Sequence, residues 1–170
     1  MHQSVYDFVA RVKEKFPEHF KGVKVWEIGS RNINGTIRTF FEGCGYTGFD
    51  LGYGPCVDVV GHFCDINHSL CAGPKTIISC EALEHDKRWR ETVNKMLDMV
   101  AWDGLIIITA GGPGRPEHGT KDHDPECSPD TLDHYENITR EEFEKTVDMN
   151  RFKEFAFEVE DGDFRFWGKK

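Results

Sequence analysis

A glycine turn followed by an acid has the most specific chemical pattern in this 170-residue chain. Gly29 ends a short apolar segment, a polar turn runs on through Gly35, and Asp50 comes about 20 residues after the first glycine. Glycine lets the backbone approach a ligand closely, and a carboxylate at this spacing can accept hydrogen bonds from both ribose hydroxyls. We therefore expect a nucleoside-containing ligand with its ribose on Asp50; the alternative is a solvated turn carboxylate.

Two acids and a histidine form a second candidate group. The stretch Cys80-Glu81-Ala82-Leu83-Glu84-His85 follows an apolar segment. Glutamate and histidine act as general bases, so Glu84 and His85 are candidate catalytic residues. They could equally orient a substrate amine or cap the next helix. Glu81 is better interpreted as part of the wall of the ligand pocket.

A loop from Gly111 to Asn137 is rich in glycine, proline and histidine. Loops of this length in a compact domain are usually functional or disordered. We predict that it closes over the ligand and supplies substrate contacts. Arg115 suits an anionic substrate group through a bidentate pair, Tyr135 is a second substrate contact, and His118 is a candidate for both substrate binding and catalysis.

The histidines of this loop are also potential metal ligands. A site built from His118, Asp122, His123 and His134 stays possible. Their spacing does not match the tight ligand pairs of metal motifs, and histidines in a polar loop are more often solvated. We therefore predict no bound metal.

The candidate residues follow short apolar segments that alternate with helical patterns, which is the order of an α/β sheet. Expected strands cover residues 23–28, 46–50, 57–60, 75–80 and 105–110. Expected helices cover residues 5–16, 36–42, 86–101 and 139–148, with Ser4, Asp86 and Thr139 as N-caps. Alternating apolar residues from Phe155 to Phe166 predict a closing antiparallel hairpin that turns at Asp161 and Gly162.

Composition limits the function classes. The length suits one α/β domain over residues 1–170, and the net charge of −9 argues against nucleic acid as the main partner. Six cysteines without a C-x-x-C pair, no apolar leader and no apolar run near 18 residues favour a cytoplasmic protein with reduced thiols and no membrane association. The amino-acid sequence does not indicate an oligomeric state.

The chain resembles the class I S-adenosylmethionine-dependent methyltransferases, in particular their small type 11 group. The likeness runs from about Val23 to the C-terminus and keeps the family's order and spacing. It implies a single-domain Rossmann-like α/β fold, with a mostly parallel seven-stranded sheet, a C-terminal antiparallel hairpin and S-adenosyl-L-methionine as cofactor. The residues that carry it are Val25–Ser30, Gly35, Tyr46–Asp50, Cys64–Asp65, Ile77–His85 and Gly104–Thr109.

The resemblance also implies a set of cofactor contacts. In the family an acid at the position of Asp65 meets the adenine amino group; the alternative here is a helix or turn cap. A leading helix covers the cofactor pocket in the family, and simple packing on the sheet is the alternative. The expected cofactor-binding residues are Glu27, Gly29, Ser30, Asn34, Gly35, Asp50, Leu51, Asp65, Cys80 and Glu81.

The predicted function is methyl transfer from S-adenosylmethionine to a small-molecule or other non-nucleic-acid substrate. Two alternatives remain. Arg31 and Ile33 stand where most family members have further glycines, which suits a non-catalytic binding module of the same fold. An NAD-dependent oxidoreductase is less favoured, because Arg31 breaks the G-x-G-x-x-G pattern that seats a pyrophosphate.

Overall fold

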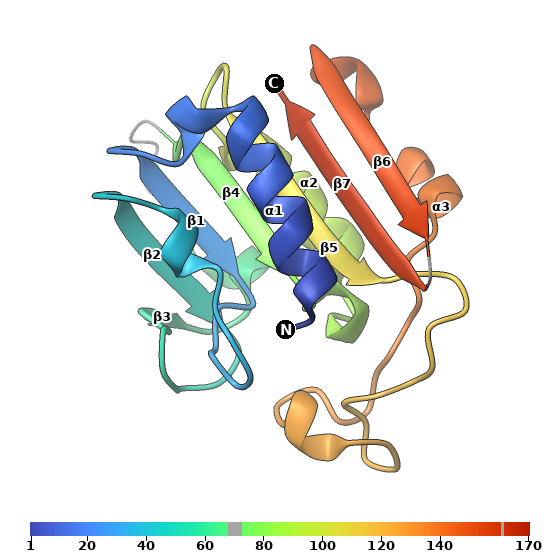
Figure 1. Cartoon of the computed structure of the whole chain (residues 1–170). Helices are drawn as coiled ribbons and strands as arrows, with labels where there is room; N and C mark the ends of the chain where they lie inside the picture. Colours follow the sequence, from blue (N-terminus) through green and yellow to red (C-terminus); the bar gives the residue numbers. More distant parts are fainter. Residues whose placement is uncertain (68–72, 161) are drawn as a thin grey trace.

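The computed structural model describes residues 1–67, 73–160 and 162–170 (Figure 1). Within these ranges seven strands form one sheet in the order β3-β2-β1-β4-β5-β7-β6. β7 is antiparallel to both of its neighbours, and the other six strands share one direction. The strands are β1 (Lys24–Ile28), β2 (Gly45–Asp50), β3 (Val59–Val60), β4 (Thr76–Cys80), β5 (Leu105–Gly111), β6 (Glu154–Glu160) and β7 (Asp163–Lys169).

The central strands are buried on both faces. Every residue of β4 and β5 is buried, as the continuous apolar run from Leu105 to Ile108 predicts for a strand with helices on both sides. The Rossmann-like fold expected from the sequence is therefore confirmed, including the closing β6–β7 hairpin. Asp161 of the hairpin turn lies outside the described residues.

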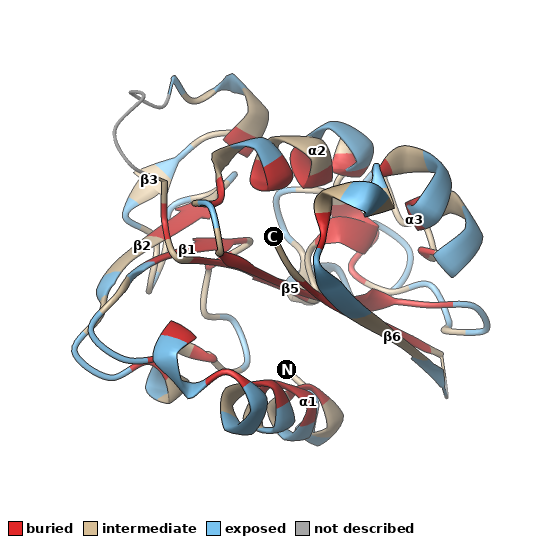
Figure 2. Ribbon diagram, turned by 90° about the horizontal axis from the view of Figure 1, so that it is seen from above, coloured by how far each residue is buried: buried red, intermediate tan, exposed pale blue. Residues whose placement is uncertain are grey.

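Helices cover both faces of the sheet (Figure 2). α1 (Gln3–Lys15) lies on one face, where Val5, Phe8, Val9 and Val12 pack against the same core as Val25 and Ile107. α2 (Trp89–Met99) and α3 (Arg140–Thr146) lie on the other face. α2 buries Trp89, Val93, Met96 and Leu97 there. Each helix thus presents one apolar stripe to the sheet.

The helix expected over residues 36–42 is absent from the described chain. A single 3-10 turn, η2 (Arg38–Phe40), stands in its place. Only seven residues separate Gly35 from Gly43, and three of them, Thr36, Ile37 and Thr39, are β-branched. Helix nucleation is costly and β-branched residues add little to it, so the segment stays a turn.

The predicted helix caps are correct in one case of three. The Thr139 hydroxyl accepts from Glu142 N at 3.1 Å and caps α3. α1 begins before Ser4, whose hydroxyl instead donates to Asp163 at 3.1 Å. α2 begins three residues after Asp86, whose carboxylate accepts from Arg88 N at 2.7 Å in the preceding turn.

Cys44, Cys56, Cys64, Cys80 and Cys127 carry free thiols, as predicted, and Cys71 lies outside the described residues. None of the helices in the described ranges is both long and apolar enough to cross a membrane.

Candidate functional site

A cavity opens at the carboxyl ends of β1, β2 and β4. This edge is where open α/β sheets bind ligands. Its walls come from the turn after β1, the end of β2, the turn after β4 and residues 127–131 of the long loop after β5. That loop lies below the carboxyl ends of the strands in Figure 1. The predicted lid thus contributes to the wall, while its closure stays a prediction.

Gly29 allows two walls of the cavity to meet. Its φ is +74°, and a Cβ built there would lie 2.2 Å from the Cβ of Ala82 in the turn after β4. The backbone N–H groups of Gly29 and Ser30 both donate to the carbonyl of Phe49, at 2.9 and 3.1 Å. A residue with a side chain would push the two turns apart, so the position requires glycine.

Asp50 lies at the end of β2 and faces the cavity. Its Oδ2 accepts from Arg31 N at 2.9 Å, and its Oδ1 accepts from Gly52 N at 3.2 Å. Burial raises the pKa of Asp50, and these backbone N–H groups oppose that effect. Each carboxylate oxygen has a further lone pair, so the group can still accept hydrogen bonds from ligand hydroxyls.

Glu27 forms a buried acidic wall of the cavity. Its side chain is 4% exposed, the Tyr46 hydroxyl donates to it at 3.0 Å, and Arg38 Nε lies 3.6 Å away. Burial raises the pKa of Glu27 to about 7, although Tyr46 and Arg38 oppose the rise. A cationic ligand beside Glu27 would stabilise its ionised form.

Of the ten predicted cofactor-binding residues, all except Asp65 line this cavity. The Asp65 side chain is 63% exposed, and both of its oxygens accept from Arg88 Nη1 at 2.9 Å. His62 and Phe63 line the cavity in its place, because the 3-10 turn η3 (Phe63–Asp65) directs the acid outward. The lining residues among the ten are Glu27, Gly29, Ser30, Asn34, Gly35, Asp50, Leu51, Cys80 and Glu81.

Some lining residues had no signal of their own in the sequence. They are the N-terminal Met1, the pair His62 and Phe63, and the segment 127–131. His62 and Phe63 could be found only as neighbours of the Cys64-Asp65 motif. α1 packs on the sheet, and the part of the N-terminal segment that lines the cavity is Met1.

Glu81 adopts a left-handed backbone conformation directly after β4, with φ of 54°. Its N–H donates to the carbonyl of Thr109 at 2.8 Å, and its Oε1 accepts from the Thr109 hydroxyl at 2.9 Å. Non-glycine residues held in this region concentrate at functional sites, because the surrounding structure must overcome their strain. The conformation places Glu81 in the cavity wall.

Arg115 does not line this cavity, and its expected role in binding an anionic substrate stays a prediction. Its guanidinium lies 3.0 Å from Glu81 Oε2 and also pairs with Asp163, and its side chain is 12% exposed. Two carboxylates therefore already compensate its charge. We interpret Arg115 as the residue that fastens the long loop to β4 and β7.

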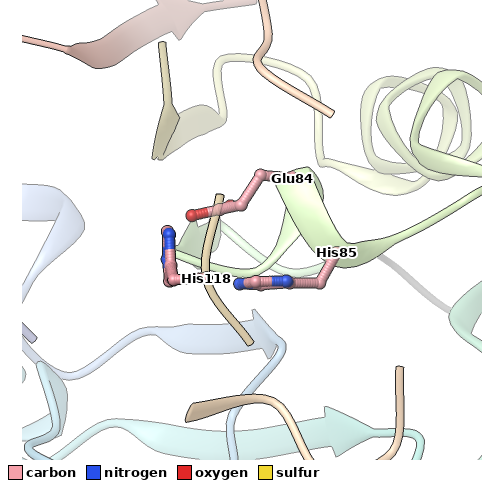
Figure 3. Close-up of side chains that lie close together, drawn as sticks. All are labelled: Glu84, His85 and His118. Carbon is pink, nitrogen blue, oxygen red and sulfur yellow. The ribbon is translucent and has the colours of Figure 1, made fainter. Parts of the chain in front are cut away.

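The three predicted catalytic residues lie close together (Figure 3). Glu84 and His85 belong to the 3-10 turn η4 (Leu83–His85), and His118 comes from the long loop. The ring centroids of His85 and His118 are 5.1 Å apart, and Tyr135 lies 5.5 and 4.9 Å from them. His85 lines the cavity, and Glu84 is fully buried.

Burial shifts the pKa values of Glu84 and His85 in opposite directions. It raises the pKa of Glu84 to about 8, with the charge of Glu81 adding to the rise. Burial, together with the charge of His118, lowers the pKa of His85 to about 4. His85 is therefore neutral at pH 7 and has a lone pair available on its ring.

The loop histidines do not assemble into the metal site that the sequence left possible. In the described residues, the atoms able to bind a metal come together from Glu84, His85 and His118, within 4.8 Å of one another. Asp122 and His123 are exposed and His134 is partly buried, and none of them joins such a group.

Solved methyltransferase structures share this fold at low sequence identity. A SAM-dependent methyltransferase from Archaeoglobus fulgidus is 15% identical, with a TM-score of 0.64 over 96% of this chain and 94% of that one. The 1,6-didemethyltoxoflavin-N1-methyltransferase of Burkholderia thailandensis, solved with 1,6-didemethyltoxoflavin and S-adenosylhomocysteine, is 12% identical, with a TM-score of 0.60 over 97% of this chain and 89% of that one.

The CurJ carbon methyltransferase is 15% identical, with a TM-score of 0.61; the match covers 95% of this chain and 51% of that chain, so this chain spans about half of it. No family model matches the chain, and no curated protein matches it. At these identities the likeness establishes the fold alone.

Proposed function

We propose that this protein binds S-adenosylmethionine in the cavity at the carboxyl ends of β1, β2 and β4 and transfers its methyl group to a small molecule. The observation that carries the proposal is the joint placement of Gly29 and Asp50 on one cavity within a Rossmann-like sheet. The solved structures of similar fold include methyltransferases with S-adenosylhomocysteine bound, which supports the choice of ligand. The narrower assignment to the type 11 group and a cytoplasmic location stay parts of the proposal.

The residues present fit this cofactor. The two Asp50 oxygens, steadied by backbone N–H groups, would accept hydrogen bonds from the ribose hydroxyls. Glu27 would compensate the positive charge of the methionine end, since its carboxylate is buried and lines the cavity. We place the adenine beside His62 and Phe63 rather than Asp65, whose carboxylate is occupied by Arg88.

The acceptor would lie against His85. S-adenosylmethionine supplies an activated methyl group, so the protein mainly has to position a nucleophile and remove a proton from it where needed. His85 is the member of the Glu84–His85–His118 group that lines the cavity, and the lone pair of its neutral ring can accept a hydrogen bond from the nucleophile. The ring of Tyr135 lies next to it, with the two ring centroids 5.5 Å apart.

The acidic net charge disfavours a nucleic acid acceptor. The test is turnover. Purified protein would be incubated with S-adenosylmethionine and a panel of small alcohols, amines and acids, and S-adenosylhomocysteine would be measured by mass spectrometry. Formation of S-adenosylhomocysteine together with a methylated acceptor supports the proposal. Binding without any turnover favours the non-catalytic module, and hydride transfer with NAD would favour the oxidoreductase.

A further inference from the structure

We propose that Glu84, His85 and His118 bind a divalent transition metal ion at the edge of the cavity. The carboxylate and the two imidazoles point toward one another, from a turn after β4 and from the long loop (Figure 3). One ligand atom from each residue lies within 4.8 Å of the others. The three side chains thus converge on one point.

Glu84 supplies the main argument. Its side chain is fully buried, its carboxylate has no side-chain hydrogen-bond partner, and no ion pair involving Glu84 occurs in the described part of the chain. Arg115, a nearby cation, is paired with Glu81 and Asp163 instead. A buried carboxylate is costly unless it is paired, bound to a metal or neutralised by a proton. A cation among Glu84, His85 and His118 would supply the missing partner.

Further unpaired polar atoms surround the same point. His85 Nδ1 and the Tyr135 hydroxyl are buried and have no hydrogen-bond partner. Natural proteins leave few such atoms, and several together indicate an ion or water that belongs there. The unpaired atoms of Glu84, His85 and Tyr135 come from two separate segments of the chain, which makes a single local irregularity a poor explanation.

The tautomer of His118 suits metal binding. Its Nδ1 lies 3.1 Å from the carbonyl oxygen of Pro116, which can only accept, so Nδ1 carries the proton. Nε2 then keeps its lone pair for a ligand. Metal-binding histidines commonly donate their other ring N–H to a backbone carbonyl in this way, which fixes the ring and its tautomer.

Gly119 brings the loop close enough to complete the group. Its φ is +64°, and a Cβ at this position would lie 2.6 Å from Cε1 of His85. Zinc–ligand bonds of about 2 Å place neighbouring ligand atoms roughly 3.3 Å apart, so atoms that lie within 4.8 Å of one another need to close by about 1.5 Å or less. Loop and side-chain adjustment around Gly119 can supply this.

The ligand types define the class of metal. Two imidazole nitrogens and one carboxylate suit zinc or iron(II), whereas magnesium and calcium prefer oxygen ligands. Three protein ligands leave a coordination position open, and His85 faces the cavity. An acceptor with a hydroxyl or carbonyl oxygen could take that position. This last step rests on the proposed function, and there His85 would act as a ligand rather than as a base.

The test is cobalt(II) binding to the full chain after treatment with a chelator. Cobalt(II) reports its ligands through visible absorption, and calorimetry with zinc gives the affinity and stoichiometry. We expect one site per chain with no thiolate charge-transfer band, and a loss of affinity of more than about 100-fold in Glu84→Gln and in His118→Ala. His123→Ala, which removes an exposed histidine of the same loop, is the matched control and should bind as wild type does.

Equal affinity in wild type, Glu84→Gln and His118→Ala would overturn the site, and so would a thiolate band that disappears in Cys127→Ser. If wild type bound no metal, a proton would be the partner of Glu84, and the proposed metal site would also be overturned. S-adenosylmethionine binding is measured on the same variants. Because Glu84 and His118 are not among the residues that line the cavity, that binding should persist. Metal binding without cofactor binding would therefore reject the proposed function alone.

Discussion

Arg31 and Asp130 form an ion pair of 2.5 Å across the mouth of the cavity. Arg31 belongs to the turn after β1, and its own backbone N–H donates to Asp50. Asp130 belongs to the long loop after β5. The pair joins the expected lid directly to the turn that holds Asp50. Both side chains are partly exposed, so breaking this contact would cost little if the loop opens as predicted.

Asp130→Ala should therefore loosen the lid without unfolding the protein. We expect faster amide hydrogen exchange over residues 120–135 and little change in stability, since partly exposed ion pairs contribute about 0–1 kcal/mol. Asp133→Ala is the matched control, because it removes an exposed carboxylate of the same loop that pairs with Lys87. Equal exchange in Asp130→Ala, Asp133→Ala and wild type would show that the Arg31–Asp130 contact does not hold the loop.

Gly29→Ala should disrupt the cavity through its contact with Ala82. Gly43 has a similar φ of +61° but no atom within 4 Å of a built Cβ, so Gly43→Ala carries the same backbone strain without the clash. We expect Gly29→Ala to cost about 1–3 kcal/mol more than Gly43→Ala in urea unfolding. The double variant Gly29→Ala with Ala82→Gly should recover most of that difference. A double variant as unstable as Gly29→Ala would disprove the clash.

Arg115→Ala should act on stability first. The substitution leaves Glu81 without its cation at a side-chain exposure of 13%, and we expect a loss of about 3 kcal/mol in urea unfolding. Arg11→Ala removes an exposed arginine that pairs with Glu158, and it should cost less than about 1 kcal/mol. Normal stability of Arg115→Ala combined with a raised KM for an anionic acceptor would restore the substrate-binding role.

Glu27 should make the protein less stable as the pH rises. Its pKa is about 7 in the folded state against an ordinary value of 4.5, so the carboxyl takes up a proton on folding between these values. The stability it contributes is fully present below pH 4.5 and is lost as the pH rises through 7, by on the order of 3 kcal/mol. The difference in unfolding free energy between Glu27→Gln and wild type should grow over this range. A difference that is constant with pH would refute the raised pKa.

The fold was predictable because its signals are local. Apolar runs such as Leu105–Ile108 and the capping residue Thr139 determine their elements from neighbouring residues. The turn at residues 36–42 differed from the helix expected there because periodicity in a seven-residue segment does not outweigh the cost of helix nucleation. The mostly parallel seven-stranded sheet followed from the family resemblance rather than from any single pattern.

The site residues that could be predicted are those that directly follow or end a parallel strand. Gly29, Asp50 and Glu81 meet because the carboxyl ends of parallel strands share one edge. Asp65 lies outside the cavity because it is paired with Arg88, and Arg115 is likewise paired with the remote residue Asp163; no local pattern reveals either partner. The approach of His118 to Glu84 likewise depends on the path of a long loop, which the sequence does not specify.

Calorimetric titration with S-adenosylmethionine tests the central claim most directly. We predict that wild type and Asp65→Ala bind it alike, that Asp50→Ala binds about 10- to 100-fold more weakly through the loss of a charge-assisted contact worth roughly 1.5–3 kcal/mol, and that NAD gives no binding. An absence of S-adenosylmethionine binding to wild type, or unchanged affinity in Asp50→Ala, would contradict the account.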